Sequence, residues 1–118
     1  MNRYICSDGS KVTQATIQRK LSEAYRLYGG RFFLCEGCGN ERATDHSHII
    51  SQKRCKELHK TELIWSRENW FYACRDCHMI WESYKSGEFG SLKNIDELLD
   101  VLRVYDYEGL QKRLNYLP

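Results

Sequence analysis

Two Cys-x-x-Cys pairs constrain the fold of this chain more than any other feature. The first pair is Cys35 and Cys38, and the second pair is Cys74 and Cys77. Four thiolates in two short clips match the ligand set of a tetrahedral structural zinc site. Disulfides would need an oxidising compartment, to which nothing in the sequence points, and close pairs at this spacing favour a metal. The sequence therefore predicts one structural Zn²⁺ bound by these four cysteines.

The composition predicts a single globular domain. The chain has 118 residues, 29% of them charged, and one proline, which is typical of one folded domain rather than a disordered chain. No apolar run approaches the roughly 20 residues of a membrane span, and the first residues lack the apolar core of a signal peptide. We therefore expect a cytoplasmic protein with no membrane contact, in which Cys6 and Cys55 are free thiols.

The hydrophobic pattern predicts an α+β fold. Thr13 is expected to cap a helix that runs to Tyr28, because apolar residues recur there at helical spacing, and Gly29-Gly30 to end it. Apolar and β-favouring runs predict strands over 31–34, 44–51 and 69–73, with a partly helical loop over 51–68. Further helices are predicted from Cys74 through Tyr84, from Asn94 with Glu97 at the capping-box position, and over 107–117. The single domain would thus combine an N-terminal helix within 10–30, a core within 32–85 and C-terminal helices within 92–118.

Several metal-binding side chains are not used by the predicted zinc site. Asp45, His46 and His48 lie between the two cysteine pairs, and His78 directly follows the second pair. Imidazole and carboxylate groups are common ligands of divalent ions, and a bound zinc would hold this interval in place. The sequence therefore indicates a second metal site with a working role.

The order of these residues resembles the HNH endonucleases, whose catalytic unit is a ββα-metal finger. Over residues 32–85, a Cys-x-x-Cys pair, a histidine strand, an asparagine and Cys-x-x-Cys-His follow one another as in that family. Four residues separate Asn69 from Cys74, the interval that the family shows, and residues 41–45 are also in its style. Either cysteine pair alone would indicate only zinc, so the ordered set carries the resemblance.

The resemblance implies both a fold and a chemistry. The fold would be a small zinc-stabilised ββα-metal finger flanked by N-terminal and C-terminal helices. The activity would be metal-dependent hydrolysis of DNA phosphodiester bonds, nicking or cleaving the DNA to leave 5′-phosphate and 3′-hydroxyl ends. A Mg²⁺, Mn²⁺ or other divalent ion would assist, and a neutral histidine would accept the proton of the attacking water. In the family pattern His78 is the helix ligand of this ion, and Asn69 braces the loop that holds the base.

Two alignments of the histidine strand compete. If His48 is the general base, Ser47 occupies the ligand position, where a hydroxyl is a poor ligand. If Asp45 is the ligand and His46 the base, a polar serine follows the base. Strand alternation places His46 and His48 on one face, so both would reach the site. We favour His48 as the base, with Asp45 or His46 completing the metal shell.

Two further groups of residues have alternative readings. Glu82 lies one helical turn after His78, either as a third ligand of the catalytic ion or as an exposed glutamate. A bound zinc with four thiolates would reduce the formal net charge of +2 to zero, so phosphate contacts would need a local basic patch. The densest basic run is either such a patch or a solvated loop face; its residues are Lys53, Arg54, Lys56 and Lys60.

The leading functional hypothesis is an HNH endonuclease of phage or mobile-element type in a bacterial or phage-infected cell. Its partner would be duplex or branched DNA, contacted through the backbone, and phage packaging or recombination proteins are further candidate partners. One alternative is a catalytically inactive zinc-stabilised module that binds nucleic acid or protein, which Ser47 at a ligand position keeps open. Another is a nuclease that acts on RNA, since the finger chemistry does not itself distinguish the sugars.

Overall fold

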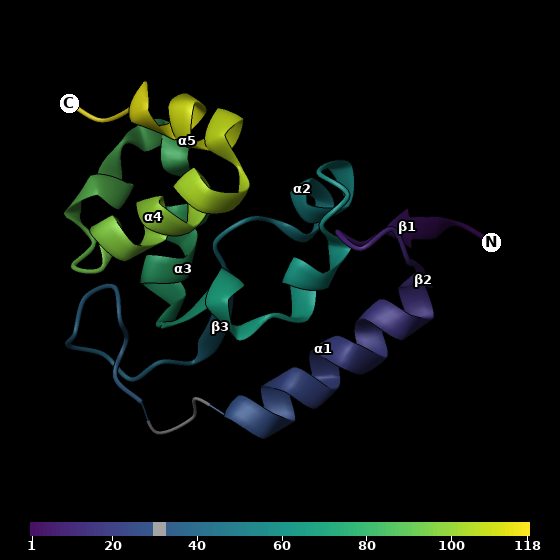
Figure 1. Cartoon of the computed structure of the whole chain (residues 1–118). Helices are drawn as coiled ribbons and strands as arrows, with labels where there is room; N and C mark the ends of the chain where they lie inside the picture. Colours follow the sequence, from purple (N-terminus) through teal and green to yellow (C-terminus); the bar gives the residue numbers. More distant parts are fainter. Residues whose placement is uncertain (30–32) are drawn as a thin grey trace.

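The computed structural model describes residues 1–29 and 33–118. These residues form five α-helices and two small two-stranded antiparallel sheets, which confirms the α+β class. In Figure 1 the first hairpin and the long helix α1 lie on one side of the molecule, and helices α4 and α5 lie on the other. Strand β3 and helix α3 lie between these two sides, so the region predicted to carry the chemistry is central.

The N-terminal part is a hairpin followed by the predicted helix. Strand β1 (Arg3–Ile5) pairs with β2 (Lys11–Thr13), and helix α1 (Gln14–Tyr28) begins directly after it. Thr13 caps the helix as predicted, because its side-chain oxygen accepts a hydrogen bond from the amide of Thr16 at 3.3 Å. The strand β2 was not predicted, since a three-residue strand with one apolar side chain gives almost no periodic signal.

The centre of the chain forms the predicted ββα unit. Strand β3 (Asp45–His48) pairs antiparallel with β4 (Trp70–Ala73), and helix α3 (Arg75–Glu82) follows with Cys74 as its N-cap. Strand β3 ends at His48 and is therefore shorter than the predicted 44–51. Beyond His48 the amide of Ile49 donates a hydrogen bond to the carbonyl of Asn69, which precedes strand β4. Half of the predicted strand 31–34, residues 31 and 32, lies outside the described residues, and in the other half Leu34 forms an isolated bridge with Arg42.

The segment between β3 and β4 is more helical than predicted. It contains helix α2 (Gln52–Glu57) and two 3-10 helices, η1 (Thr61–Trp65) and η2 (Arg67–Asn69). Arg54 on α2 donates two hydrogen bonds, at 3.0 and 2.9 Å, to the carboxylate of Asp106. This bidentate pair joins the central unit to the C-terminal helices.

The C-terminal part packs two helices on the central unit. Two 3-10 turns, η3 (Tyr84–Ser86) and η4 (Glu88–Ser91), lead into α4 (Ile95–Tyr105) and α5 (Tyr107–Leu114). Asn94 precedes α4 as predicted, but its side chain makes no capping hydrogen bond, so the expected capping box with Glu97 is absent. The reason is that Asn94 has ψ 22° instead of the extended backbone that a capping side chain requires. Helix α5 also ends at Leu114, three residues before the predicted 107–117 limit.

The cysteine pairs belong to the main hydrophobic core. Cys35, Cys74 and Cys77 are buried in the same cluster as Trp81 and Phe89. The core therefore joins the predicted zinc site, helix α3 and the C-terminal segment in one packed body. Among the described residues, none of the helices has the length and apolar character needed to cross a membrane.

Candidate functional site

The four cysteines of the two pairs form a cluster that could hold a metal ion such as zinc. The Sγ atoms of Cys35, Cys38, Cys74 and Cys77 all lie within 4.8 Å of one another. The amides of Gly37 and Cys38 approach Sγ of Cys35 at 3.3 and 3.5 Å, as donors that stabilise a thiolate. A Cβ atom at Gly37 would lie 3.0 Å from Cβ and Sγ of Cys77, a tight contact with the cluster, so this position of the clip turn favours glycine. The donor set and its spacing fit a tetrahedral structural site.

The pKa values of these thiols determine how many protons a metal ion must displace when it binds. Burial raises the pKa of both Cys74 and Cys77, whereas backbone hydrogen bonds from Glu41 and Asn40 lower the pKa of Cys38 to about 7. A metal ion binds the thiolate, so its binding must displace the protons of Cys74 and Cys77. These two thiols therefore depend on a metal ion to stabilise their charged form.

His48 is held in one orientation at the end of β3. Its Nε2 donates a hydrogen bond of 2.8 Å to the carbonyl of Ile64, which leaves Nδ1 free to accept a proton. Burial of the ring lowers the pKa of His48; the hydrogen bond to Ile64 opposes this effect, and the nearby charge of His78 adds to it. His48 is therefore neutral at pH 7, the state that a general base needs.

Asn69 ties the segment after His48 to the start of β4. This asparagine is fully buried, and its Oδ1 accepts a hydrogen bond of 2.9 Å from the amide of Ile50. Its Nδ2 donates to the carbonyl oxygens of Ile50 and Leu63 at 3.0 and 3.1 Å. Leu63 precedes Ile64, so one side chain fixes both the turn after the base and the segment that orients its ring.

We expect Asn69→Ala to lower the free energy of unfolding by about 3 kcal/mol, because three buried backbone groups lose their partner. The measurement is urea unfolding of the zinc-loaded protein. The matched control is Asn115→Ala, at an exposed position after α5, which should change stability by less than about 0.5 kcal/mol. Equal stability of the two variants would contradict a bracing role for Asn69.

His78 lies between two carboxylates at the start of α3. Its Nδ1 is 2.7 Å from Oδ2 of Asp45, and its Nε2 is 2.8 Å from Oε1 of Glu82. Burial would raise the pKa of Asp45, but hydrogen bonds from His78 and Thr44 and the charge of Arg75 outweigh it and hold the pKa below its usual value. Asp45 is therefore an ionised acceptor for the Nδ1–H of His78, while the other ring nitrogen, Nε2, faces the carboxylate of Glu82.

His46 is engaged by aromatic side chains rather than by metal-binding groups. Its ring stacks on Tyr25 with centroids 4.1 Å apart and meets the edge of Trp70 at 4.5 Å. Its Nε2 also contacts the carbonyl of Gly29. Ser47 between the two histidines is fully buried, and its hydroxyl has no hydrogen-bond partner among the described residues. These contacts favour His48 over His46 as the free base of the strand.

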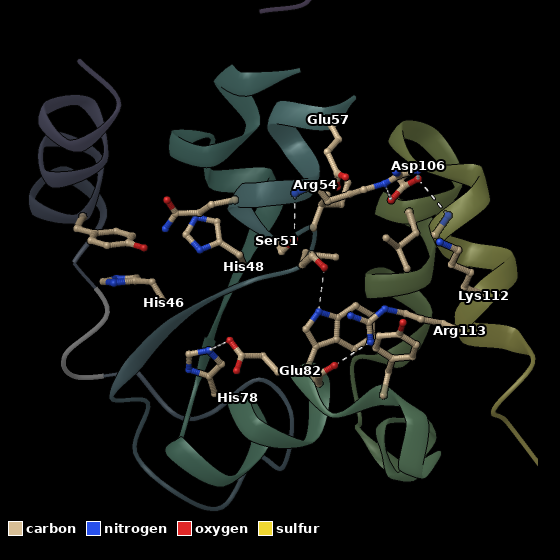
Figure 2. Close-up of a pocket in the computed structure, with 18 residues that line it drawn as sticks. His46, His48, Ser51, Arg54, Glu57, His78, Glu82, Asp106, Lys112 and Arg113 are labelled. Carbon is tan, nitrogen blue, oxygen red and sulfur yellow. Dashed lines mark hydrogen bonds and ion pairs between the residues drawn. The ribbon is translucent and has the colours of Figure 1, made fainter. Parts of the chain in front are cut away.

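A cavity of about 700 Å³ connects these groups with the C-terminal helix. His46, His48, His78 and Glu82 line it from the ββα unit. Figure 2 shows the three histidines at one side and Arg54, Lys112 and Arg113 at the other. The contribution of α5 was missed by the sequence reasoning. That helix is brought to the site by contacts between distant segments, among them the pairing of Arg54 on α2 with Asp106 at the start of α5 and the packing of Arg113 on Trp81.

The four predicted ligands of a catalytic ion do not converge on one point. Asp45 and Glu82 contact opposite nitrogens of His78, and Asp45 lines a separate cavity of about 470 Å³. In the ranges 1–29 and 33–118, the four cysteines are the one group that brings three or more ligand atoms within 4.8 Å. The N,O donors at His78 nonetheless suit a divalent ion, since imidazole with carboxylate is a common ligand combination.

Internal contacts occupy most of the predicted basic patch. Arg54 binds Asp106, Lys60 donates to the carbonyl of Tyr105 at 2.8 Å, and Lys56 donates to Gln14 at 2.8 Å. Lys53 is exposed. Three of these four cations thus have a role in joining α2 and η1 to the rest of the fold, and contact with nucleic acid stays a prediction for the patch.

No protein-family model, curated protein or solved structure matches this chain.

Proposed function

We propose that this protein is a metal-dependent endonuclease of the HNH type that hydrolyses phosphodiester bonds in DNA. One observation carries the proposal. The ββα unit places His48, oriented by a backbone carbonyl, and His78, oriented by Asp45, in the wall of the same cavity. A neutral base and a nitrogen ligand in one cavity are two of the requirements for phosphodiester hydrolysis.

His48 would act as the general base. Because Nε2 donates to Ile64, the free Nδ1 would take the proton of the attacking water. Asn69 would keep the ring in place by fixing the backbone on both sides of this contact. The orientation is built into the fold, so the base needs no rearrangement before the reaction.

His78 and Glu82 would hold the catalytic divalent ion, because both line the cavity and contact each other. When bound, a Mg²⁺ or Mn²⁺ ion would stabilise the charge that develops on the scissile phosphate. Asp45 would orient His78 through Nδ1, in the arrangement of a carboxylate that supports a metal-binding histidine. This orienting role differs from the direct ligand role that the sequence predicted for Asp45. The two roles predict different losses of metal affinity when Asp45 is replaced.

We expect the zinc-loaded protein to bind one further Mn²⁺ ion, measured by calorimetry or by the loss of the free-ion signal in electron paramagnetic resonance. Glu82→Gln and His78→Ala should weaken this binding by at least about 100-fold, since each removes a ligand. Asp45→Asn should weaken it by about 10-fold to 100-fold, as the loss of an orienting carboxylate does. The matched control is Glu57→Gln, which removes a carboxylate of the same cavity from α2. A zinc-loaded protein that binds no further ion would contradict the proposal.

A second candidate function is a zinc-stabilised binding module without catalysis. It is favoured by the finding that Asp45 and Glu82 satisfy His78 on opposite sides and do not form a compact cluster with it. Such a module would bind one tight zinc and no further divalent ion, so the same titration separates the two functions.

The proposed nuclease would act in the cytoplasm of a bacterial or phage-infected cell. Its partner would be duplex or branched DNA, alone or together with phage packaging or recombination proteins. These assignments follow from the resemblance of residues 32–85 to phage-type HNH enzymes.

A further inference from the structure

Arg113 of helix α5 is a half-buried cation in the wall of the candidate active-site cavity. Its guanidinium carbon lies 3.6 Å from the centroid of the Trp81 ring and 4.5 Å from that of Tyr84. Its Nη1 donates a hydrogen bond of 2.8 Å to the carbonyl of Trp81. The guanidinium is thus packed against two aromatic rings and hydrogen-bonded to the backbone of α3.

The charge of Arg113 is not neutralised within the fold. In the part of the chain that the structure describes, no carboxylate lies within 4.0 Å of its guanidinium. Asp106 is the carboxylate whose charge raises the pKa of Arg113, but Arg54 already binds both of its oxygens. Glu82, across the cavity, contacts His78. Burial lowers the pKa of Arg113 to about 10, so the group stays charged at neutral pH while lacking much of its hydration.

We propose that Arg113 binds a backbone phosphate of the DNA strand whose neighbouring phosphate is cut, and so positions that strand in the cavity. The inference rests on the proposed nuclease function. A guanidinium has five N–H donors, and a hydrogen bond to another part of the protein is found here for one nitrogen, Nη1. The other N–H groups of this fixed, charged guanidinium can donate hydrogen bonds to the oxygens of a phosphate.

A phosphate also fits the other charges of the cavity. Lys112 of the same helix lines the cavity, and its one ion pair within the described residues is an exposed contact with Glu108 at 3.8 Å. Arg113 and Lys112 therefore place positive charge opposite the histidines, as Figure 2 shows. A strand that crosses the cavity could place one phosphate near His48 and His78 and a neighbouring phosphate at Arg113. The C-terminal helix would then be part of the DNA-binding surface rather than only a support for the finger.

The test is DNA binding by the zinc-loaded protein without added divalent ion, so that no cleavage occurs. The probe is a fluorescein-labelled duplex of about 20 base pairs, followed by anisotropy between about 50 and 200 mM salt. Arg113→Met keeps an unbranched apolar stem on Trp81 and removes the charge. It should make the negative slope of the logarithm of the binding constant against the logarithm of the salt concentration less steep by about 0.9, which corresponds to the loss of one phosphate contact. Arg113→Lys should keep the slope while binding more weakly, because it keeps the charge and loses the planar fork.

The matched control is Arg103→Met, which removes the same charge from an exposed position on α4 that does not line the cavity. It should leave the slope unchanged. Should Arg113→Met fail to fold, the side-chain Nε–H resonance of Arg113 in the unaltered protein gives a second measurement. This resonance should shift when the duplex is added, and that of Arg103 should not. An unchanged slope in Arg113→Met, or an unshifted Arg113 resonance, would overturn the inference.

The outcome separates this inference from the proposed function. If the protein nicks DNA and Arg113→Met keeps the wild-type salt slope, the nuclease proposal stands and the phosphate contact is wrong. If the slope becomes less steep but no DNA is cut with any divalent ion, the phosphate contact stands and the nuclease proposal fails.

Discussion

Replacing His48 by alanine is expected to reduce DNA nicking by about 10²-fold to 10⁴-fold, the usual contribution of a positioned general base. The ring of His48 is oriented by its hydrogen bond to Ile64 and lines the cavity that also contains His78. Alanine would remove the proton acceptor and leave the strand pairing with Trp70 intact. The measurement is the rate at which supercoiled plasmid becomes open circular in Mg²⁺ or Mn²⁺, with zinc-loaded protein.

Two further histidine variants make this test specific. His59→Asn is the matched control, because His59 is exposed at φ 57°, a left-handed backbone conformation that asparagine tolerates. It should nick at the wild-type rate. His46→Ala should reduce nicking less than His48→Ala, since His46 packs against Tyr25. The reverse order of effects would show that Asp45 and His46 are the ligand and base, and that the assignment of His48 is wrong.

Replacing Cys35 by serine is expected to lower the free energy of unfolding by on the order of 3 kcal/mol, about a quarter of the roughly 10–16 kcal/mol that a four-ligand zinc site contributes. A domain of this size has a net stability of only about 5–15 kcal/mol, so the loss would be large. The cluster also lies within the main core, where it joins the clip turn to the start of α3. The measurement is thermal unfolding, followed by circular dichroism, together with zinc content.

Cys6→Ser is the matched control for the cluster. Cys6 is also buried, but its Sγ is not part of the four-cysteine group. The control should keep the zinc and lose less stability than Cys35→Ser. A strong chelator should unfold the wild type and the control alike. A chain that stays folded after chelation would contradict a structural role for the metal.

Local patterns with a fixed spacing were predictable from the sequence. The helix from Thr13 to Tyr28 follows from its apolar stripe and its cap, and the ββα unit follows from the cysteine pairs and the aromatic run before Cys74. Each clip is a short turn that places two sulfur atoms together, and the cluster of four follows because two such clips make up the ligand set of one tetrahedral zinc ion.

Contacts between distant segments were not predictable in the same way. Asn94 carries the right residue type for a helix cap, yet tertiary packing gives it a backbone conformation in which the side chain cannot cap. The sequence predicted Arg54 as a candidate DNA contact, but its guanidinium binds the carboxylate of Asp106, 52 residues away. Arg113 had no signal in the sequence at all, since its importance depends on the packing of α5 against Trp81. A single sequence holds no periodic pattern for such pairs.

The measurement that tests the central claim most directly is plasmid nicking by the unaltered, zinc-loaded protein in Mg²⁺ and in Mn²⁺, beside His78→Ala. The account predicts that the wild type converts supercoiled plasmid to open-circular DNA only when a divalent ion is added. It also predicts that His78→Ala, which lacks the nitrogen that faces Glu82, does not. A folded, zinc-loaded wild-type protein that leaves supercoiled, linear and branched DNA intact with each ion would contradict the account.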